Sequence, residues 1–385
     1  MSRLLYSITT FVEHTSPSDP PDKVWPKPLQ ELNEGDLLLL VRCFKIKPCF
    51  NLKNFGEHNI QHFSALKNLQ ELEIDHLQLS SFMPNIKGYF DHFPKLKTLI
   101  LGEPKATCWE ILYFVGLFQT LQDLRLCNFD CTEEDETEDC LSLIPPLIPP
   151  LQHLVLERIK GEKFVDGMIK VYKMLDIRCM GLQWVQLECI QWLLDACAGT
   201  LETLRLNPAD LKRESFLFCF LFFWGATQRF TTDHLAARSQ LNLSKLKSLQ
   251  TLEFTADAST HADQATLNFL KSTLPTLLSP LNIVMVHHHP LLWIIFFNNR
   301  VRPERYEALG KIHKEWNFRL VLCIENPDGQ MIERDVRRLN GIVEAQRGFN
   351  EDLDSLLSQT LVISRTSTHI VWDCTTSEST AQIFL

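Results

Sequence analysis

Glycine is scarce in this chain, with 14 residues in 385, and positive charge is in deficit. There are 38 Lys and Arg against 47 Asp and Glu, which gives a formal net charge of −9. This balance argues against nucleic-acid binding, whose affinity rests on neutralising phosphates. The longest apolar runs, 216–224 and 291–297, are much shorter than the roughly 20 residues that span a bilayer, so we expect no membrane partner.

Motifs that would indicate an enzyme are also missing. The sequence contains no Gly-x-x-x-x-Gly-Lys-Ser/Thr, Gly-x-Gly-x-x-Gly, Gly-x-Ser-x-Gly or His-Glu-x-x-His. We therefore predict a protein that is not an enzyme and has no catalytic residue, cofactor or bound metal. One alternative stays open: on a strand, His287 and His289 would share a face and could give a metal-dependent hydrolase two ligands.

The N-terminus and the cysteines bear on the compartment. Residues 1–14 lack the apolar core and the small-residue cleavage site of a secretory signal, so we expect an intracellular protein of the cytoplasm, the nucleus or both. The 12 cysteines form no Cys-x-x-Cys pair, and most have apolar neighbours. We expect them to be reduced, buried thiols.

A short leucine motif, Leu-x-x-Leu-x-Leu with conservative replacements, recurs along the chain. Clear copies begin at Leu69, Leu96, Leu121, Leu151, Leu201 and Leu249. The first three intervals are 27, 25 and 30 residues, close to the period of leucine-rich repeats. Weaker copies are predicted at Tyr172 and Leu278.

The motif predicts one short buried strand in each repeat, because residues two apart on a strand point to the same face. Between copies the apolar spacing turns helical, around 109–116 and 190–197. Strands alternating with helices at this period imply parallel strands joined by crossovers. The predicted fold is α/β: an irregular leucine-rich-repeat solenoid with strands on the concave face, helices on the convex face and terminal caps. A compact leucine-rich α/β domain is the alternative.

The repeats also suggest a division of the chain. We expect an N-terminal cap over 1–60, a solenoid over 61–300 and a C-terminal α/β cap over 301–385. The aromatic stretch at 211–240 lacks an amphipathic period and reads as an atypical insert. The acidic run 130–139 reads as a solvated loop.

Residues between the repeat leucines should be displayed on the concave sheet, where solenoids bind partners. If the strands stack in register, they form two columns of mixed charge. The first column is Glu71, Thr98, Asp123, His153, Thr203 and Thr251, and the second is Glu73, Ile100, Arg125, Val155, Arg205 and Glu253. We predict that Glu71, Glu73, Asp123, Arg125, His153, Arg205 and Glu253 contact a protein or peptide partner. A merely solvated face is the alternative.

Several phrases resemble the leucine-rich-repeat region of F-box-like proteins of mushroom-forming fungi. They are WPKPLQELNEGDLL (25–38), FSALKNLQELEI (63–74), SFMPNIKGYF (81–90), ILYFVGLFQTLQDLRL (111–126), LLDACAGTLETLRL (193–206) and FRLVLCIENP (318–327). The resemblance implies a substrate-recognition solenoid that serves as the adaptor of a ubiquitin ligase. No Leu-Pro-x-Glu-like phrase, which usually opens an F-box, precedes Trp25. Ubiquitin-ligase components are therefore expected as partners only if an F-box is encoded upstream. A degenerate or truncated product without a partner remains a further alternative.

Overall fold

The computed structural model divides the chain into two compact units, Met1–Cys197 and Ala198–Leu385. Each unit is described by itself. The structure describes residues 6–10, 41–46, 66–77, 79, 88, 93–130, 149–172, 176–183, 185–207, 241–256, 269–271, 273–274, 282–287, 319–325, 360–365 and 369–376.

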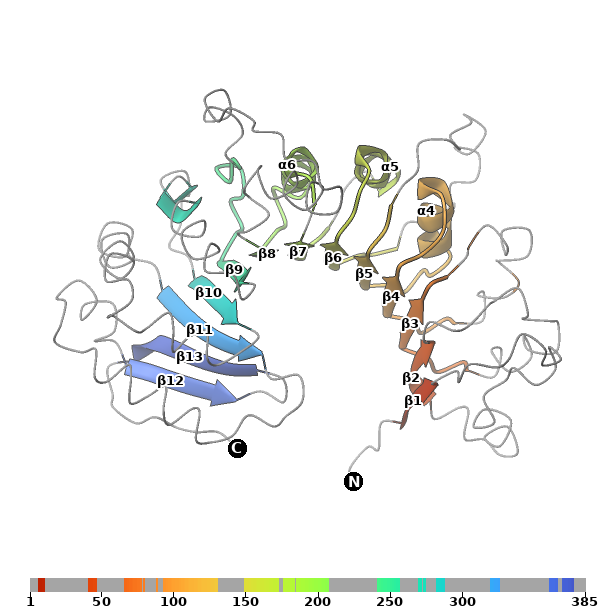
Figure 1. Cartoon of the computed structure of the whole chain (residues 1–385), viewed down its shortest axis with the longest axis horizontal. Coiled ribbons are helices and arrows are strands. Elements are labelled where there is room, and N and C mark those ends of the chain that lie inside the picture. Colours follow the sequence, from red (N-terminus) through yellow and green to blue (C-terminus); the bar gives the residue numbers. More distant parts are fainter. Residues whose placement is uncertain are drawn as a thin grey trace, which may run out of the picture. The chain divides into compact units, whose positions relative to one another are not determined.

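The first unit contains a sheet of parallel strands that follow one another in chain order (Figure 1). Each strand pairs with the next in parallel, and the register is continuous except for a shift between Tyr6 and Ser7 in the pairing of β1 with β2. The strands are β1 (Tyr6–Thr10), β2 (Val41–Ile46), β3 (Glu71–Asp75), β4 (Thr98–Gly102), β5 (Asp123–Cys127), β6 (His153–Glu157) and β7 (Cys179–Gln183).

The repeat leucines form the core of this sheet. In β5, for example, Leu124 and Leu126 are buried, while Asp123 and Arg125 alternate with them on the other side. Register places Leu124 between Leu99 and Leu154, so equivalent leucines of successive repeats stack. Burying one leucine side chain is worth about 1.5–3 kcal/mol, and each stacked repeat adds such residues. The motif thus specifies both the strand and its neighbours.

In the described part of the first unit, three helices cover one face of the sheet, on the outer side of the arc that its strands follow (Figure 1). They are α4 (Cys108–Gly116), α5 (Glu162–Tyr172) and α6 (Leu187–Ala196), and α5 packs against both of the others. The start of α4 is fixed by a capping box: the Glu110 amide donates to the Thr107 hydroxyl, and Glu110 accepts from the Thr107 amide. The opposite face of the sheet is therefore free of these helices.

The second unit continues the same construction over four parallel strands. These are β8 (Thr203–Leu206), β9 (Thr251–Ala256), β10 (Asn282–His287) and β11 (Arg319–Glu325), paired in chain order. Its sheet then changes direction, because β13 (His369–Thr376) pairs antiparallel with both β11 and β12 (Thr360–Arg365).

The α/β leucine-rich-repeat solenoid predicted from the sequence is confirmed, with parallel strands and helices on one face. The copy predicted at Tyr172 is wrong: α5 extends to Tyr172, and the strand of this repeat is β7, whose buried residues are Met180, Gly181 and Leu182. The insert at 211–240 lies outside the described residues. The division at residues 60 and 300 stays a prediction.

The cysteines agree only in part with the expectation of reduced, buried thiols. Cys43, Cys127, Cys179, Cys189 and Cys197 are free thiols, but of these five only Cys189 and Cys197 are buried, and the other three are half-buried. Cys108 is instead disulfide-bonded, so the expectation of reduced thiols is wrong there. In the described part of the chain, no helix has the length and apolar character to cross a membrane.

Candidate functional site

The predicted columns lie on what we call the display face: the strand residues that alternate with the buried ones in each unit. In the first unit, register aligns Glu71, Thr98, Asp123 and His153 in one row and Glu73, Ile100, Arg125 and Val155 in the next. In the second unit, Thr203 lies opposite Thr251, and Arg205 lies opposite Glu253. The structure therefore brings the predicted residues together within each unit.

Most charges on the display face are paired with one another. The Lys45 ammonium on β2 lies 2.6 Å from Glu73 and 3.9 Å from Glu71. The hydrogen bond to Glu73 raises the pKa of Lys45, and partial burial opposes this rise. Sequence reasoning missed Lys45, because its strand, VRCFKI, carries no leucine motif.

The next charged group on this face is a pair from neighbouring strands. His153 Nδ1 contacts Asp123 Oδ1, and Asp123 Oδ2 accepts a hydrogen bond from the Thr98 hydroxyl at 3.2 Å. In the second unit, Arg205 Nη2 lies 2.7 Å from Glu253 Oε1. Cross-strand pairs of this kind stabilise a sheet by roughly 0.2–1 kcal/mol each. These pairs also neutralise side chains that could otherwise form ion pairs with a partner.

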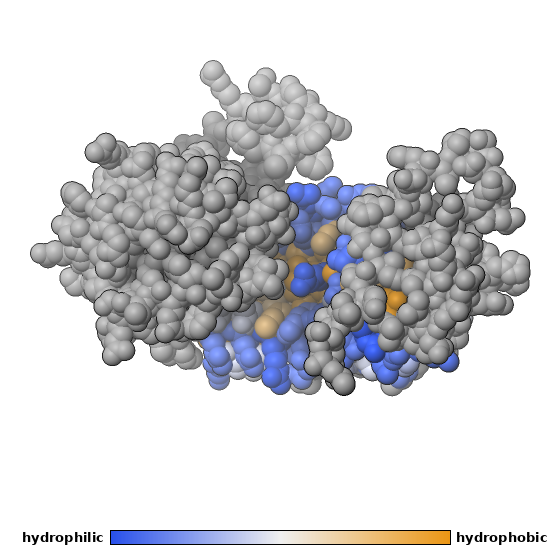
Figure 2. Space-filling model, turned by 90° about the horizontal axis from the view of Figure 1, so that it is seen from below, coloured by the Kyte–Doolittle hydropathy of each residue, from blue (hydrophilic) through white to orange (hydrophobic). Residues whose placement is uncertain are grey.

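Arg125 is the exception among the charged members of the columns. Within the described ranges it makes no ion pair, and its side chain is exposed. Its register neighbours are the half-buried Ile100 and Val155. Seen from the side opposite the helices, the described residues show hydrophobic colour in the middle and hydrophilic colour around it (Figure 2). Arg125 is thus an available cation beside an apolar surface.

A second candidate site lies where strands β3 to β6 end. The residue after each of these strands has a left-handed backbone, with φ between 45° and 56°: His76, Glu103, Asn128 and Arg158. We call these four the edge residues. Each donates its backbone N–H to the carbonyl of the last residue of the next strand, over 2.6–2.8 Å. Left-handed backbone costs an L-residue about 1–2 kcal/mol, and these hydrogen bonds offset it.

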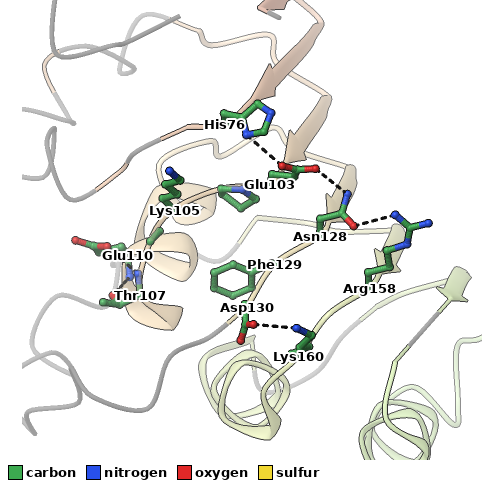
Figure 3. Close-up of a pocket in the computed structure, with 12 residues that line it drawn as sticks. His76, Glu103, Lys105, Thr107, Glu110, Asn128, Phe129, Asp130, Arg158 and Lys160 are labelled. Carbon is green, nitrogen blue, oxygen red and sulfur yellow. Dashed lines mark hydrogen bonds and ion pairs between the residues drawn. The ribbon is translucent and has the colours of Figure 1, made fainter. Parts of the chain in front are cut away.

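The edge residues also join through their side chains, as Figure 3 shows. His76 Nδ1 lies 3.2 Å from Glu103 Oε2, and Asn128 Nδ2 donates to Glu103 Oε1 at 3.5 Å. Arg158 Nη1 donates to Asn128 Oδ1 at 3.3 Å. Four repeats thus contribute one polar side chain each to a continuous row.

This row borders a cavity of about 710 Å³, which lies wholly within the first unit. Its other lining residues are Pro104, Lys105, Ala106, Thr107, Glu110, Phe129, Asp130 and Lys160. Phe129 and Pro104 are buried, whereas Lys105, Arg158 and Lys160 are exposed. A concave site of this volume is typical of small ligands.

Sequence reasoning missed this cavity. Of the four edge residues, Asn128 alone has the residue type that follows the strand in regular leucine-rich repeats. His76, Glu103 and Arg158 differ from it in type, so no shared motif marked the position. Their common left-handed backbone becomes visible only in the structure.

The structure describes only one of the two histidines of the alternative metal site. His287 is the last residue of β10, opposite Ala256 and Ile324, and His289 lies outside the described residues. Within the ranges that the structure describes, no three His, Cys, Asp or Glu side chains are arranged to hold a metal ion.

Buried cysteines are poor nucleophiles here. Burial raises the pKa of Cys197 to about 12, and burial together with Glu162 and Glu188 raises the pKa of Cys189 to about 12. Burial and the neighbouring Glu157 raise the pKa of Cys127 to about 11. Since the thiolate is the reactive form, these thiols have little of it near neutral pH.

Comparison with known proteins gives few matches. Neither a scan against protein-family models nor a search of curated proteins finds a match. Among solved structures, the chain is similar to the leucine-rich-repeat-containing protein LegL7 from Legionella pneumophila. The similarity covers 85% of this chain and 96% of that chain, with 14% sequence identity and a TM-score of 0.46.

Proposed function

We propose that this chain is a non-catalytic scaffold that binds a protein or peptide partner through the display face. The observation that carries the proposal is Arg125, an exposed cation that makes no ion pair with the described residues and whose strand neighbours are Ile100 and Val155. Arginine beside apolar surface is a common feature of protein interfaces. The buried leucines hold the strands in place, so the displayed residues can serve recognition without disturbing the core.

The paired charges define which partner would fit. Lys45 with Glu73 and His153 with Asp123 are already balanced, so they favour a partner with polar rather than highly charged side chains at those places. Arg125 favours an acidic or carbonyl group there. The proposed partner is therefore a protein segment with one acidic residue flanked by apolar ones.

Charge reversal on the display face tests this proposal. We compare partner capture from cell extract by the wild type, by Arg125→Glu/Arg205→Glu, and by Lys67→Glu/Lys247→Glu. The control variant makes the same charge change at exposed turn residues of the two units. We expect the display-face variant to lose the captured partner and the control to retain it. Equal capture by all three would remove the proposal, provided that circular dichroism shows each variant folded.

The finer proposal is that the partner is a substrate delivered to a ubiquitin ligase. It rests on the resemblance to F-box-like proteins of mushroom-forming fungi, carried most specifically by residues 63–126 and 193–206. Sequencing the 5′ end of the transcript tests it. An upstream exon that encodes a three-helix F-box would support the adaptor role, and a transcript that begins at the codon for Met1 would remove it.

Two other functions remain distinguishable by simple measurements. A metal-dependent hydrolase using His287 and His289 requires bound metal, so stoichiometric zinc in purified protein would favour it over the scaffold. A degenerate product without a partner would not hold a cooperative fold. A cooperative thermal melt would therefore count against degeneracy.

A further inference from the structure

The cavity beside the edge residues contains two cations that no acidic side chain of the described residues neutralises. Lys105 is exposed, and its ammonium makes no hydrogen bond or ion pair within the described chain. Among the described residues, the one hydrogen-bond acceptor of the Arg158 guanidinium is the neutral side-chain oxygen of Asn128. By contrast, the third cation of the cavity, Lys160, lies 3.1 Å from Asp130.

The acids of the cavity are already engaged. Glu110 accepts the Thr107 amide at 2.8 Å in the capping box of α4. Asp130 pairs with Lys160, and Glu103 contacts His76 and Asn128. Lys105 and Arg158 are therefore left as the groups able to take a new charged partner.

The exposure of the lining residues indicates which class of ligand the cavity would bind. Phe129 and Pro104 line the cavity but are buried, whereas the cations Lys105, Arg158 and Lys160 are exposed at its rim. In the view of Figure 3, Lys105 lies on one side of Phe129 and Arg158 on the other. A group that accepts hydrogen bonds in several directions suits such a rim better than an apolar one does.

We propose that this cavity binds an anionic group, a carboxylate or a phosphate, between Lys105 and Arg158. The site differs from the display face: it lies at the carboxyl edge of the strands and shares no residue with the columns. The same chemistry could come from a small free anion or from an acidic side chain of a peptide. The experiment separates these two sources.

Calorimetric titration of the full chain at low ionic strength provides the test. The probes are inorganic phosphate, succinate, and an acidic hexapeptide with its glutamine counterpart. The variants are Lys105→Gln/Arg158→Gln and the control Lys67→Gln/Lys97→Gln, which loses the same two positive charges at exposed residues that precede β3 and β4. Should the first variant fail to fold, Lys105→Gln alone replaces it, because the Lys105 side chain is exposed and its ammonium makes no hydrogen bond or ion pair with the described residues.

The proposal expects binding that weakens about threefold for Lys105→Gln and about tenfold for the double variant, since hydrogen bonds to ionised groups are among the stronger ones. The control should stay close to wild type, and raising the salt concentration should weaken binding. Binding of phosphate or succinate identifies a small-anion site. Binding of the acidic peptide, but of neither small anion nor the glutamine peptide, identifies a side-chain site. No binding of any probe, or an equal loss in the control, would overturn the proposal.

Discussion

Replacing Leu154 by alanine should destabilise the protein by about 3 kcal/mol. Leu154 is completely buried in β6, in register with Leu124 on one side and Met180 on the other. The change removes three carbons, about 2.4 kcal/mol at ~0.8 kcal/mol each, and the cavity left behind adds to this cost. Tight stacking on both sides limits how far the neighbours can close the gap.

Val155→Ala is the matched control one residue further along the same strand. Val155 is half-buried on the display face, so its loss should cost less than about 1 kcal/mol. Urea unfolding gives both values, followed by circular dichroism and by tryptophan fluorescence because repeat arrays can unfold in parts. A Leu154→Ala variant as stable as wild type, or an equal cost for Val155→Ala, would refute the assignment of the leucines to the core.

Three more predictions follow from the local geometry. Glu103→Gly should leave the free energy of unfolding almost unchanged, because glycine adopts the left-handed backbone without strain and this gain offsets the lost contacts with His76 and Asn128. Glu103→Val should lower the free energy of unfolding by about 1–2 kcal/mol, as measured by urea unfolding. Cys189 and Cys197 should react with iodoacetamide at pH 8 far more slowly in the native protein than in urea, by peptide mass spectrometry. Glu73→Gln should lower the pKa of Lys45, measured by NMR of the labelled lysine.

The Lys45 prediction has a defined dependence on pH. Because its folded-state pKa is raised above 10.5, the pair with Glu73 stabilises the protein fully below that value. The contribution is lost as the pH rises through the folded-state pKa. The stability difference between wild type and Glu73→Gln should therefore be constant near neutral pH and shrink above about pH 10.5. A difference that grows with pH in that range would show that another group is responsible.

Results that would contradict the other two predictions are equally specific. Equal stability of the Gly and Val variants at position 103 would mean that the left-handed backbone is not maintained in solution. Alkylation of Cys197 at the same rate in native and unfolded protein would mean that this thiol is not buried.

Strands whose core positions are leucines could be predicted from the sequence. Each clear copy of the motif coincides with a strand, because the spacing of its last two leucines matches the two-residue period of a strand. Their register also followed, since equivalent leucines can stack only if the strands align. The helices α4 and α6 were predictable from their apolar spacing in the same way.

Strands whose buried residues are mostly not leucine could not be found by this pattern. In β7 the buried residues are Met180, Gly181 and Leu182, of which only one is a leucine, so the strand was predicted several residues too early, from the pattern at Tyr172. The strand β2 was missed for the same reason, and with it Lys45. The carboxyl-edge cavity depends on backbone angles that four different residue types adopt, so tertiary hydrogen bonding sets it rather than local sequence preference.

Cross-linking between neighbouring strands tests the in-register parallel ladder most directly. Cys179 lies opposite His153 in the pairing of β6 with β7 and is a free thiol. His153→Cys should therefore be bridged to Cys179 by a short bifunctional thiol reagent such as dibromobimane, as detected by peptide mass spectrometry. Val155→Cys, on the same face but two residues out of register, should give little of that product. Efficient bridging of Val155→Cys, or none of His153→Cys, would contradict the ladder.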